Sequence, residues 1–375
     1  MILSDVCEFI VDCPHSTAPD EGKGYPLIRT PNVGKGRLDL NGVHRVSESV
    51  YKQRIQRGAP QANDLIFARE APAGNVALVQ ENQTVCLGQR TVLIRPNVQK
   101  VNPQYLVYYL LSPKPQYELL GTANGATVAH VNLPAIRNLK IELPEKSVQD
   151  KIGTILVTYD DLIENNQKQI KLLEEAAQRL YKEWFVDLHF PGHENTKVVD
   201  GVPEGWRKFP LEEIAPVVTG KKDANYGDKG GNYPFFTCSQ ETITAPGYSF
   251  DTSAVILAGN GDFNVKLYRG KFEAYQRTYV LAPFDHSNLF NLYFTVQDNM
   301  EALTKGASGS TIKFLTKGML QKILVLTADK KILDKFNDYE ENIQQKVEAL
   351  KKQVEDLTEI RNRLLPKLMS GEVEV

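Results

Sequence analysis

Cysteine is scarce in this sequence. Among 375 residues there are four, and no two of them have the Cys-x-x-Cys spacing of zinc sites and redox motifs. Four cysteines are too few for a disulfide framework, so we expect reduced, partly buried thiols. Cys7, Cys13 and His15 lie close in the sequence but lack a second pair of ligands, and His189 and His193 stand beside a turn. We therefore predict no metal site.

Long apolar stretches are also missing. No run reaches the roughly 18–20 residues that a membrane-spanning helix needs. The first residues, MILSDVCEFIVDCPHS, have neither the basic segment nor the apolar stretch of a signal peptide. We therefore expect no membrane association and a cytoplasmic location. The apolar fraction of 42% and the charged fraction of 24% are ordinary for a globular chain, whose length allows two or three domains.

The chain has no overall excess of positive charge. Its net charge of −2 argues against a protein coated in basic residues. Residues 1–143 carry 15 Lys and Arg against 12 Asp and Glu, and residues 201–326 carry 13 against 12. Residues 144–200 carry 7 against 11, and residues 327–375 carry 9 against 11. We therefore expect any polyanion to bind the first and third segments.

Catalytic motifs are absent as well. No GxxxxGK[ST] phosphate loop occurs. The tetrapeptide that begins at Asn102 (NPQY) is one residue away from the NPPY signature of amino-methyltransferases, but no cofactor-binding glycine motif precedes it. Asp12, Glu21 and Lys23 fit the carboxylate-and-lysine pattern of metal-dependent nucleases only loosely. We therefore predict that the chain is not an enzyme.

The sequence contains an internal repeat. The stretch that begins at Leu3 (LSDVCEFIVDCPHS) aligns with the stretch that begins at Leu211 (LEEIAPVVTGKKDA), at an offset of 208 residues. Four shorter matches follow in the same order: Tyr25-Pro26 with Tyr233-Pro234, Asn75-Val76 with Asn264-Val265, Gln89-Arg90-Thr91 with Gln276-Arg277-Thr278, and Gly125-Ala126 with Gly306-Ala307. The offset shrinks along the chain, so the second copy has lost loop residues.

Each copy begins with a segment of mixed secondary structure. Short β-type runs alternate with turn residues, at 65–68, 91–96, 254–258 and 278–283. One helix is predicted in each copy: NPQYLVYYLLS, with Asn102 as N-cap and Pro103 at the first position, and SNLFNLYFTVQD, with Ser287 as N-cap. We expect two α+β globules.

Each copy ends with a long helix, from Glu145 to about Val186 and from Ala328 to about Leu365. Polar Asn166 could fix the register, Arg361 interrupts the second apolar row, and Pro366 should end or kink the second helix. The apolar residues follow the steps of three and four of a coiled-coil seam: Ile163, Ile170, Leu173, Ala177, Leu180 and Trp184, then Ile343, Val347, Leu350, Val354, Leu357 and Leu364. We predict that the two helices pair, the alternative being that each lies on its own globule.

Residues 23–69 form the most basic window, with nine Lys and Arg against three Asp and Glu. This charge, among Gly, Asn and Thr, favours a surface that contacts DNA phosphates, and an ordinary solvated loop is the alternative. Arg and Asn side chains can also read base edges. The candidate DNA contacts of the first copy are Arg29, Thr30, Asn32, Lys35, Arg37, Arg69 and Arg90.

The second copy has polar, glycine-rich loops in corresponding places. Its candidate DNA contacts are Lys221, Lys222, Asn225, Tyr226, Lys229, Asn260, Lys266, Arg277, Ser308, Ser310 and Lys313. If the copies read different sequences, residues common to both are scaffold or phosphate contacts. Base recognition is then expected where the copies differ, in 27–45 and 220–245.

Three stretches resemble segments of the specificity subunits of type I restriction–modification systems. LPEKSVQDKI (143–152) is similar to the start of that family's first spacer helix, LYKEWFVDLHFPG (180–192) to its end, and RNRLLPKLMSGEVEV (361–375) to the usual carboxy terminus. The resemblance covers essentially the whole chain. It implies a target-recognition domain (1–143), a helical spacer (144–200), a second target-recognition domain (201–326) and a second spacer (327–375).

The resemblance implies that each recognition domain reads half of an asymmetric, interrupted site in double-stranded DNA. The long helices would pair antiparallel, with pseudo-twofold symmetry, and set the gap between half-sites. Two modification subunits with S-adenosylmethionine would methylate adenine, and an ATP-driven restriction subunit, with Mg²⁺, could join. This chain itself would bind no cofactor.

Tyr181, Trp184 and Phe185 are candidate docking residues for these partners, and core packing of Trp184 is the alternative. Two other functional classes remain open: a catalytic methyltransferase or nuclease with its own recognition domain, and a coiled-coil adaptor without a DNA role.

Overall fold

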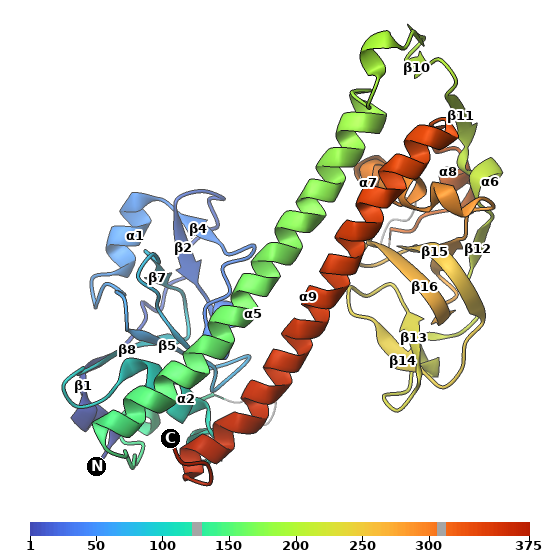
Figure 1. The fold of residues 1–375 in the computed structure, drawn as a ribbon. Coiled ribbons are helices and arrows are strands. Elements are labelled where there is room, and N and C mark those ends of the chain that lie inside the picture. The colour runs from blue at the N-terminus through green and yellow to red at the C-terminus, as the bar shows by residue number, and fades with distance from the viewer. Residues whose placement is uncertain (122–129, 306–312) are drawn as a thin grey trace. The chain divides into compact units, whose positions relative to one another are not determined.

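The protein, described by a computed structural model over residues 1–121, 130–305 and 313–375, folds into two compact units. Unit 1 comprises residues 1–169 and 350–375, and unit 2 comprises residues 170–349. Each unit combines a mixed globule with one end of both long helices, α5 (Lys146–Tyr181) and α9 (Lys330–Ser370), labelled in Figure 1. The α+β class, with globules alternating with long helices, is confirmed. None of the helices described is long and apolar enough to cross a membrane.

The globule of unit 1 is built on two sheets, of order β1-β8-β5-β6-β3 and β4-β2-β7. The predicted runs 65–68 and 91–96 coincide with β5 and β8. The strands are β1 (Cys7–Asp12), β2 (Tyr25–Ile28), β3 (Gly36–Arg37), β4 (Arg45–Val46), β5 (Leu65–Ala68), β6 (Val76–Leu78), β7 (Cys86–Leu87) and β8 (Thr91–Pro96).

Helix α2 joins the larger sheet of unit 1 to α5 (Figure 1). As predicted, Asn102 caps it: the side-chain oxygen accepts a hydrogen bond from the Tyr105 amide at 3.0 Å, and Pro103 follows. Helix capping therefore accounts for the tetrapeptide NPQY. The shorter helices of this unit are α1 (Glu48–Arg54), α2 (Pro103–Leu111), α3 (Pro113–Gly121) and α4 (Leu133–Arg137).

The globule of unit 2 contains a six-stranded sheet of order β12-β17-β15-β16-β13-β14. Two further pairs, β9 with β10 and β11 with β18, form two-stranded sheets. The strands of unit 2 are β9 (Val198–Val199), β10 (Val202–Pro203), β11 (Arg207–Pro210), β12 (Val217–Thr219), β13 (Tyr233–Phe236), β14 (Ile243–Ala245), β15 (Phe250–Ala258), β16 (Val265–Ala274), β17 (Thr278–Leu281) and β18 (Leu324–Thr327). Its helices are α6 (Leu211–Ile214), α7 (Leu289–Lys305) and α8 (Lys317–Gln321). The predicted runs 254–258 and 278–283 fall in β15 and β17.

One prediction about α7 is wrong. Ser287 is not the N-cap, because it lies inside a 3₁₀ turn (His286–Asn288) and α7 begins at Leu289. Asp285 caps that turn instead, and its carboxylate accepts a hydrogen bond from the Ser287 amide at 2.9 Å. A carboxylate is a strong acceptor for free amides at the start of a helical segment, which explains the shift of two residues.

The duplication is preserved in the pairing register of the two sheets. Ala68 pairs with Thr91 as Ala258 pairs with Thr278, and Tyr25 pairs with Val46 as Tyr233 pairs with Ala245. Three of the short matches therefore begin equivalent strands, β2 with β13, β6 with β16, and β8 with β17. The Gly125-Ala126 and Gly306-Ala307 match lies outside the described residues.

The alignment of the stretch at Leu3 with the stretch at Leu211, at an offset of 208 residues, shifts by one residue along β1. The amides of Cys13 and Gly220 donate to the carbonyls of Thr91 and Thr278, at 3.1 Å each, so Cys13 corresponds to Gly220 at an offset of 207. A bulge between Cys7 and Phe9 explains the difference, because it adds a residue to β1. Asp12 is therefore the counterpart of Thr219.

In unit 1 the two long helices run antiparallel, with polar contacts inside their seam. Asn166 donates to the side-chain oxygen of Gln353 at 3.2 Å, and Arg361 pairs with Asp160. The residue that interrupts the apolar row thus has a buried partner. Of the two outcomes predicted at Pro366, an end or a kink, the first is wrong, since α9 continues to Ser370. Leu364, Leu365, Leu368 and Met369 pack on the core of unit 1, and this burial offsets the lost backbone hydrogen bond.

Candidate nucleic-acid interface

The arginines of the basic window mostly bind the protein itself. Arg54, which is 4% exposed, donates to the carbonyl oxygens of Pro14 and Ser16, and Arg57 donates to that of Cys13 at 3.1 Å. Arg45 donates to the Gly24 carbonyl oxygen at 2.7 Å. These guanidinium groups hold irregular loops that lack strand partners. The charge counted in the sequence therefore overstates what is free to meet phosphates.

Asn32 is a structural residue of its turn. Its side-chain oxygen accepts from the Arg29 amide, and its NH₂ group donates to the Asp39 carbonyl oxygen, each at 3.2 Å. It is 7% exposed. Since both ends of the amide are bonded to backbone, Asn32 cannot read a base edge in this conformation. Thr30 stands in the same 3₁₀ turn, half-buried, and Lys35 is exposed.

Arg37 contacts the long helix of its own unit. It lies in β3, and its guanidinium pairs with the carboxylate of Asp161 on α5. Only 18% of its side chain is exposed. Asp160, the neighbour of Asp161, accepts a hydrogen bond from the Tyr108 hydroxyl on α2 at 2.6 Å. The Arg37–Asp161 pair joins the predicted reading loop 27–45 to α5, and the Tyr108–Asp160 hydrogen bond joins α2 to α5.

Arg69 and Arg90 belong to a charge network at the end of the larger sheet in unit 1. Arg69 donates to the Asp12 carboxylate at 2.6 Å and to the Val131 carbonyl oxygen at 2.9 Å, and it contacts the His130 ring at 2.8 Å. Glu70 binds both His130 and Arg90. Both predicted DNA contacts are thus partnered by carboxylates, although Arg90 keeps 62% of its side chain exposed.

In unit 2, several predicted residues gather at the corresponding end of the sheet. The Gln276 amide donates to the Lys222 carbonyl oxygen at 2.9 Å, so loop 220–226 lies beside Arg277. The ammonium group of Lys222 lies 4.3 Å from the centre of the Tyr226 ring. Lys221, Asn225, Arg277 and Lys313 are exposed, and the half-buried Asn260 bridges to the residue after Lys313. Ser308 and Ser310 lie outside the described residues.

Two predicted residues of unit 2 lie in other surroundings. Lys266 donates to the Ser239 carbonyl oxygen at 2.9 Å, and desolvation lowers the pKa of its ammonium group. Lys229 is exposed in the turn before β13. Lys229 therefore lies on a loop that differs between the copies, whereas Lys266 lies on strand β16.

A hollow of about 300 Å³ opens in unit 2 beside Arg277. Gln276 and Arg277, from the duplicated match, form one wall, and Phe314 and Lys317 form another. Phe314, Lys317 and Thr219 were not predicted as site residues. The sequence contained a signal, since Phe314 and Lys317 lie close behind the predicted contact Lys313. The alignment of Thr219 with Asp12, by contrast, required the bulge in β1.

The candidate docking residues are packed in the interior of unit 2. Trp184 and Phe185, in the π-helical turn Lys182–Val186, are each 5% exposed, and Tyr181 is 7% exposed. The Trp184 and Phe185 rings lie 5.8 and 4.9 Å from that of Phe336 on α9. This burial favours the core-packing alternative for Trp184.

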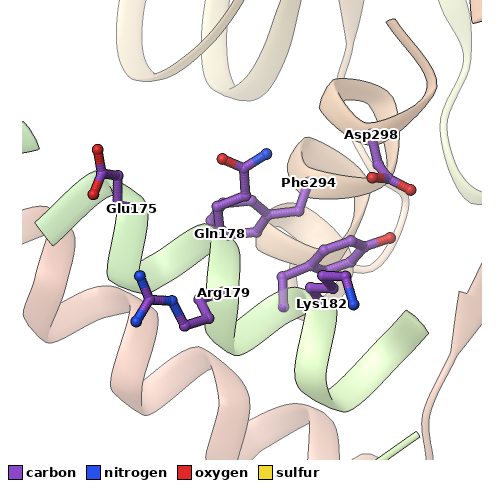
Figure 2. A pocket seen from close by; sticks show the side chains of 7 residues that line it. Glu175, Gln178, Arg179, Lys182, Phe294 and Asp298 are labelled. Carbon is purple, nitrogen blue, oxygen red and sulfur yellow. The ribbon is translucent and has the colours of Figure 1, made fainter. Parts of the chain in front are cut away.

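A second hollow of unit 2, of about 310 Å³, lies between α5 and α7. Figure 2 shows Glu175, Gln178, Arg179 and Lys182 on one side of it and Phe294 and Asp298 of α7 on the other. Its rim carries both signs of charge, with Arg179 and Lys182 against Glu175 and Asp298. Such a lining suits a protein surface better than a DNA phosphate.

The metal cluster and the loose nuclease pattern considered above are not assembled in the described ranges. There, no three His, Cys, Asp or Glu side chains come close enough to hold a metal ion. Burial raises the pKa of the Cys7 and Cys86 thiols to about 12, so neither is a thiolate nucleophile at neutral pH. Asp12 and Glu21, from the loose nuclease pattern, bind separate partners, Arg69 and Ser47.

Comparisons with known proteins relate the chain to a family of DNA specificity proteins. The family model described as "Type I restriction modification DNA specificity domain" matches residues 1–175 and 203–356. The chain is 38% identical over 176 residues to the type I restriction enzyme EcoDI specificity subunit of Escherichia coli, which covers 46% of this chain and 39% of that one.

Two further similarities extend over most of the chain. It is 28% identical over 366 residues to the MjaIX specificity subunit of Methanocaldococcus jannaschii, covering 89% of this chain and 83% of that one. The crystal structure of the type I restriction–modification S subunit from M. genitalium has the same fold, with a TM-score of 0.62 at 16% identity, covering 98% and 95% of the two chains.

Proposed function

Since the chain belongs to the family of type I restriction–modification DNA specificity subunits, we propose that each of its globules reads one half of a bipartite, asymmetric DNA site. The observation that carries this proposal is the duplication: two sheets with the same pairing register support loops that differ. Equal frameworks present their loops to DNA in the same way, while different loops recognise different bases.

The loops between equivalent strands are where the copies differ most. Between β2 and β4 the first copy has a turn, strand β3 and a further loop, whereas β13 and β14 are joined by a shorter connection, residues 237–242. Loops 27–45 and 220–245 are therefore our candidates for base recognition. Arg29, Thr30, Lys35 and Lys221 lie on these loops and are not buried.

The long helices are suited to hold the reading globules apart. Helices of 36 and 41 residues are roughly 54 and 62 Å long at about 1.5 Å per residue. Half-sites one DNA turn apart are separated by roughly 34 Å, so such helices can set that spacing with length left for partners. The contact between Asn166 and Gln353 opposes slippage of the helices past each other.

The chemistry belongs, in this proposal, to partner subunits. Two modification subunits would bring S-adenosylmethionine and methylate adenine, and restriction subunits would bring ATP and Mg²⁺. This chain would supply the recognition surface and the exposed faces of α5 and α9 for docking, and it would act on genomic DNA in the cytoplasm.

Genome-wide mapping of N6-methyladenine tests the function. The mapping compares cells that have the gene with cells that lack it, both expressing the cognate modification subunits. We expect one two-part motif to disappear on deletion and to return on complementation. If no motif depends on the gene, the proposal is wrong. Exchange of loop 27–45 for that of a relative with another motif should change only one half of the motif.

Purified chain incubated with S-adenosylmethionine and duplex DNA separates this proposal from the catalytic alternative. We expect no methyl transfer until modification subunits are added. Methylation by the chain alone would favour a methyltransferase with its own recognition domain. Failure to bind any duplex, with or without those subunits, would favour the coiled-coil adaptor.

A further inference from the structure

We propose that the hollow beside Arg277 in unit 2 binds a phosphate group of the DNA backbone, with Arg277 as its principal ligand. The inference rests on the proposed DNA-reading function. It names a site through which the globule of unit 2 would contact the DNA phosphate backbone. It follows from the comparison of this hollow with the same place in unit 1, which is closed.

Backbone hydrogen bonds establish the correspondence between the two places. The amide of Arg69 donates to the carbonyl of Arg90 at 2.9 Å, and the amide of Gly259 donates to that of Arg277 at the same distance. The Val131 amide then donates to the Arg69 carbonyl as the Leu315 amide does to that of Gly259. Arg69 therefore corresponds to Gly259, and Arg90 to Arg277.

In unit 1 this place is filled by side chains of opposite charge. Asp12 pairs with Arg69, whose guanidinium also contacts His130, and Glu70 pairs with Arg90. The exposed fractions of the Asp12, Glu70 and Arg69 side chains are only 14%, 13% and 11%. The cluster is therefore electrically balanced and has little room for a ligand.

In unit 2 every partner of that network is replaced. Only the arginine at the position of Arg90 is kept, as Arg277. Gly259 stands for Arg69, Thr219 for Asp12, Phe314 for His130 and Asn260 for Glu70. Arg277 is exposed, and it has no hydrogen bond or ion pair through its side chain among the described residues. The loss of both carboxylates leaves an open space beside an arginine that has no ion-pair partner in the described part of the chain.

The open space is enforced by backbone packing. A Cβ atom at Gly259 would lie 2.3 Å from the Arg277 carbonyl oxygen, closer than any side chain tolerates. In this backbone conformation a side chain at position 259 would force the Arg277 carbonyl to shift, and glycine there leaves unfilled the place that Arg69 fills in unit 1.

The lining suits a phosphate. Arg277 and Lys317 are both exposed and cationic, the hydroxyl groups of Thr219 and Thr316 can donate hydrogen bonds, and the lining contains no carboxylate. Phe314, 38% exposed, adds an apolar surface on which the sugar of the same nucleotide can rest. A fork of guanidinium donors matches the oxygens of a phosphate better than a neutral ligand.

The test uses the full-length chain and a 30-base-pair duplex of mixed sequence, with affinity measured by fluorescence anisotropy over a series of KCl concentrations. Removal of one phosphate contact lowers the slope of log affinity against log salt by about 0.9. We expect R277A to show this change and to bind about tenfold more weakly at low salt. R277K should keep most of the slope, because it retains the charge.

Arg90 supplies the matched control, because it occupies the same place but is already paired with Glu70. We expect R90A to lower the slope less than R277A does, because Glu70 already neutralises Arg90, and E70Q, which frees Arg90, to increase it. Melting temperatures of R277A and R277K should agree with that of the wild type. Equal slopes for the wild type and R277A, or equal losses for R90A and R277A, would overturn the proposal.

Failure of this inference is distinguishable from failure of the proposed function. A wild-type chain that does not bind the mixed-sequence duplex has no phosphate site in this hollow, since backbone contacts do not depend on sequence. The methylation motif is determined in separate cells and decides the proposed function by itself.

Discussion

Arg361, on α9, forms an ion pair with Asp160, on α5, inside unit 1. Asp160 is 2% exposed and also accepts a hydrogen bond from the Tyr108 hydroxyl at 2.6 Å. Three helices thus meet at one buried carboxylate. A buried ion pair adds little net stability, because removing both charges from water costs about as much as their attraction returns. A buried charge without its partner is strongly destabilising. The pair therefore favours the one alignment of the helices that brings Arg361 to Asp160.

The first prediction concerns this pair. R361A leaves a buried carboxylate without its cation, and we expect the free energy of unfolding to fall by about 3–5 kcal/mol. Chemical denaturation measures it. R363A is the control on the same helix, because Arg363 pairs with Glu359 in an exposed position and its loss should change little. A double variant, D160L with R361M, should recover most of the stability. A small effect of R361A would show that the pair is dispensable.

The second prediction concerns Asn166, which is 7% exposed in the helix seam. Replacement by leucine removes the hydrogen bond to Gln353 and adds apolar surface, so we expect N166L to melt at a higher temperature. The register should become less specific, with more dimers and larger species. Light scattering coupled to size exclusion reports them. A variant that stays as homogeneous as the wild type would contradict a register role.

The third prediction concerns Glu340, a fully buried carboxyl on α9 in unit 2. Neither of its oxygens has a hydrogen-bond partner in the described structure, and burial raises its pKa from 4.5 to about 8. Between these values the folded state holds a proton that the unfolded state has lost. Glu340 therefore lowers stability as the pH rises through this window.

Substitution of Glu340 by glutamine tests this linkage. E340Q should match the wild type near pH 5 and be more stable by about 2 kcal/mol or more at pH 8.5. Thermal unfolding at a series of pH values measures the difference. E348Q, at an exposed position of the same helix, should follow the wild type. Parallel curves for the wild type and E340Q would be the contrary result.

The fourth prediction separates packing from docking on the long helices. Trp184 is buried against Phe336, and we expect W184A to lose about 3–5 kcal/mol of stability. Leu172, on α5, is 64% exposed, so L172S should melt like the wild type. If α5 docks modification subunits, L172S should weaken their co-elution with the chain on size exclusion. Unchanged co-elution would exclude Leu172 from the docking surface.

Local patterns predicted the elements of this fold well. The runs 65–68 and 91–96 are strands with those bounds, Asn102 caps its helix, and the seam residues Val347 and Leu350 are buried. Such features depend on neighbours in the sequence. The end of the second helix was missed at Pro366 because packing of Leu368, a tertiary contact, outweighs the local effect of proline.

The candidate DNA contacts were harder to judge from sequence. Arg, Asn and Lys were chosen by residue type, yet Asn32 holds its own turn and Arg37 pairs with Asp161. Composition does not distinguish a guanidinium that binds a carbonyl from one that is free. Arg90 and Arg277 look alike in the sequence, and only Glu70, which is brought to Arg90 by the fold, makes them different.

The amino-acid sequence by itself determined that the chain has two similar halves, each a mixed globule followed by a long helix, and it indicated the family. Periodicity, caps and repeated landmarks act over short stretches and can be recognised there. The tertiary structure decided which charges are compensated and where space remains. That depends on strand register and on the bulge in β1, which set Thr219 in the place of Asp12 and leave Arg277 facing an open hollow.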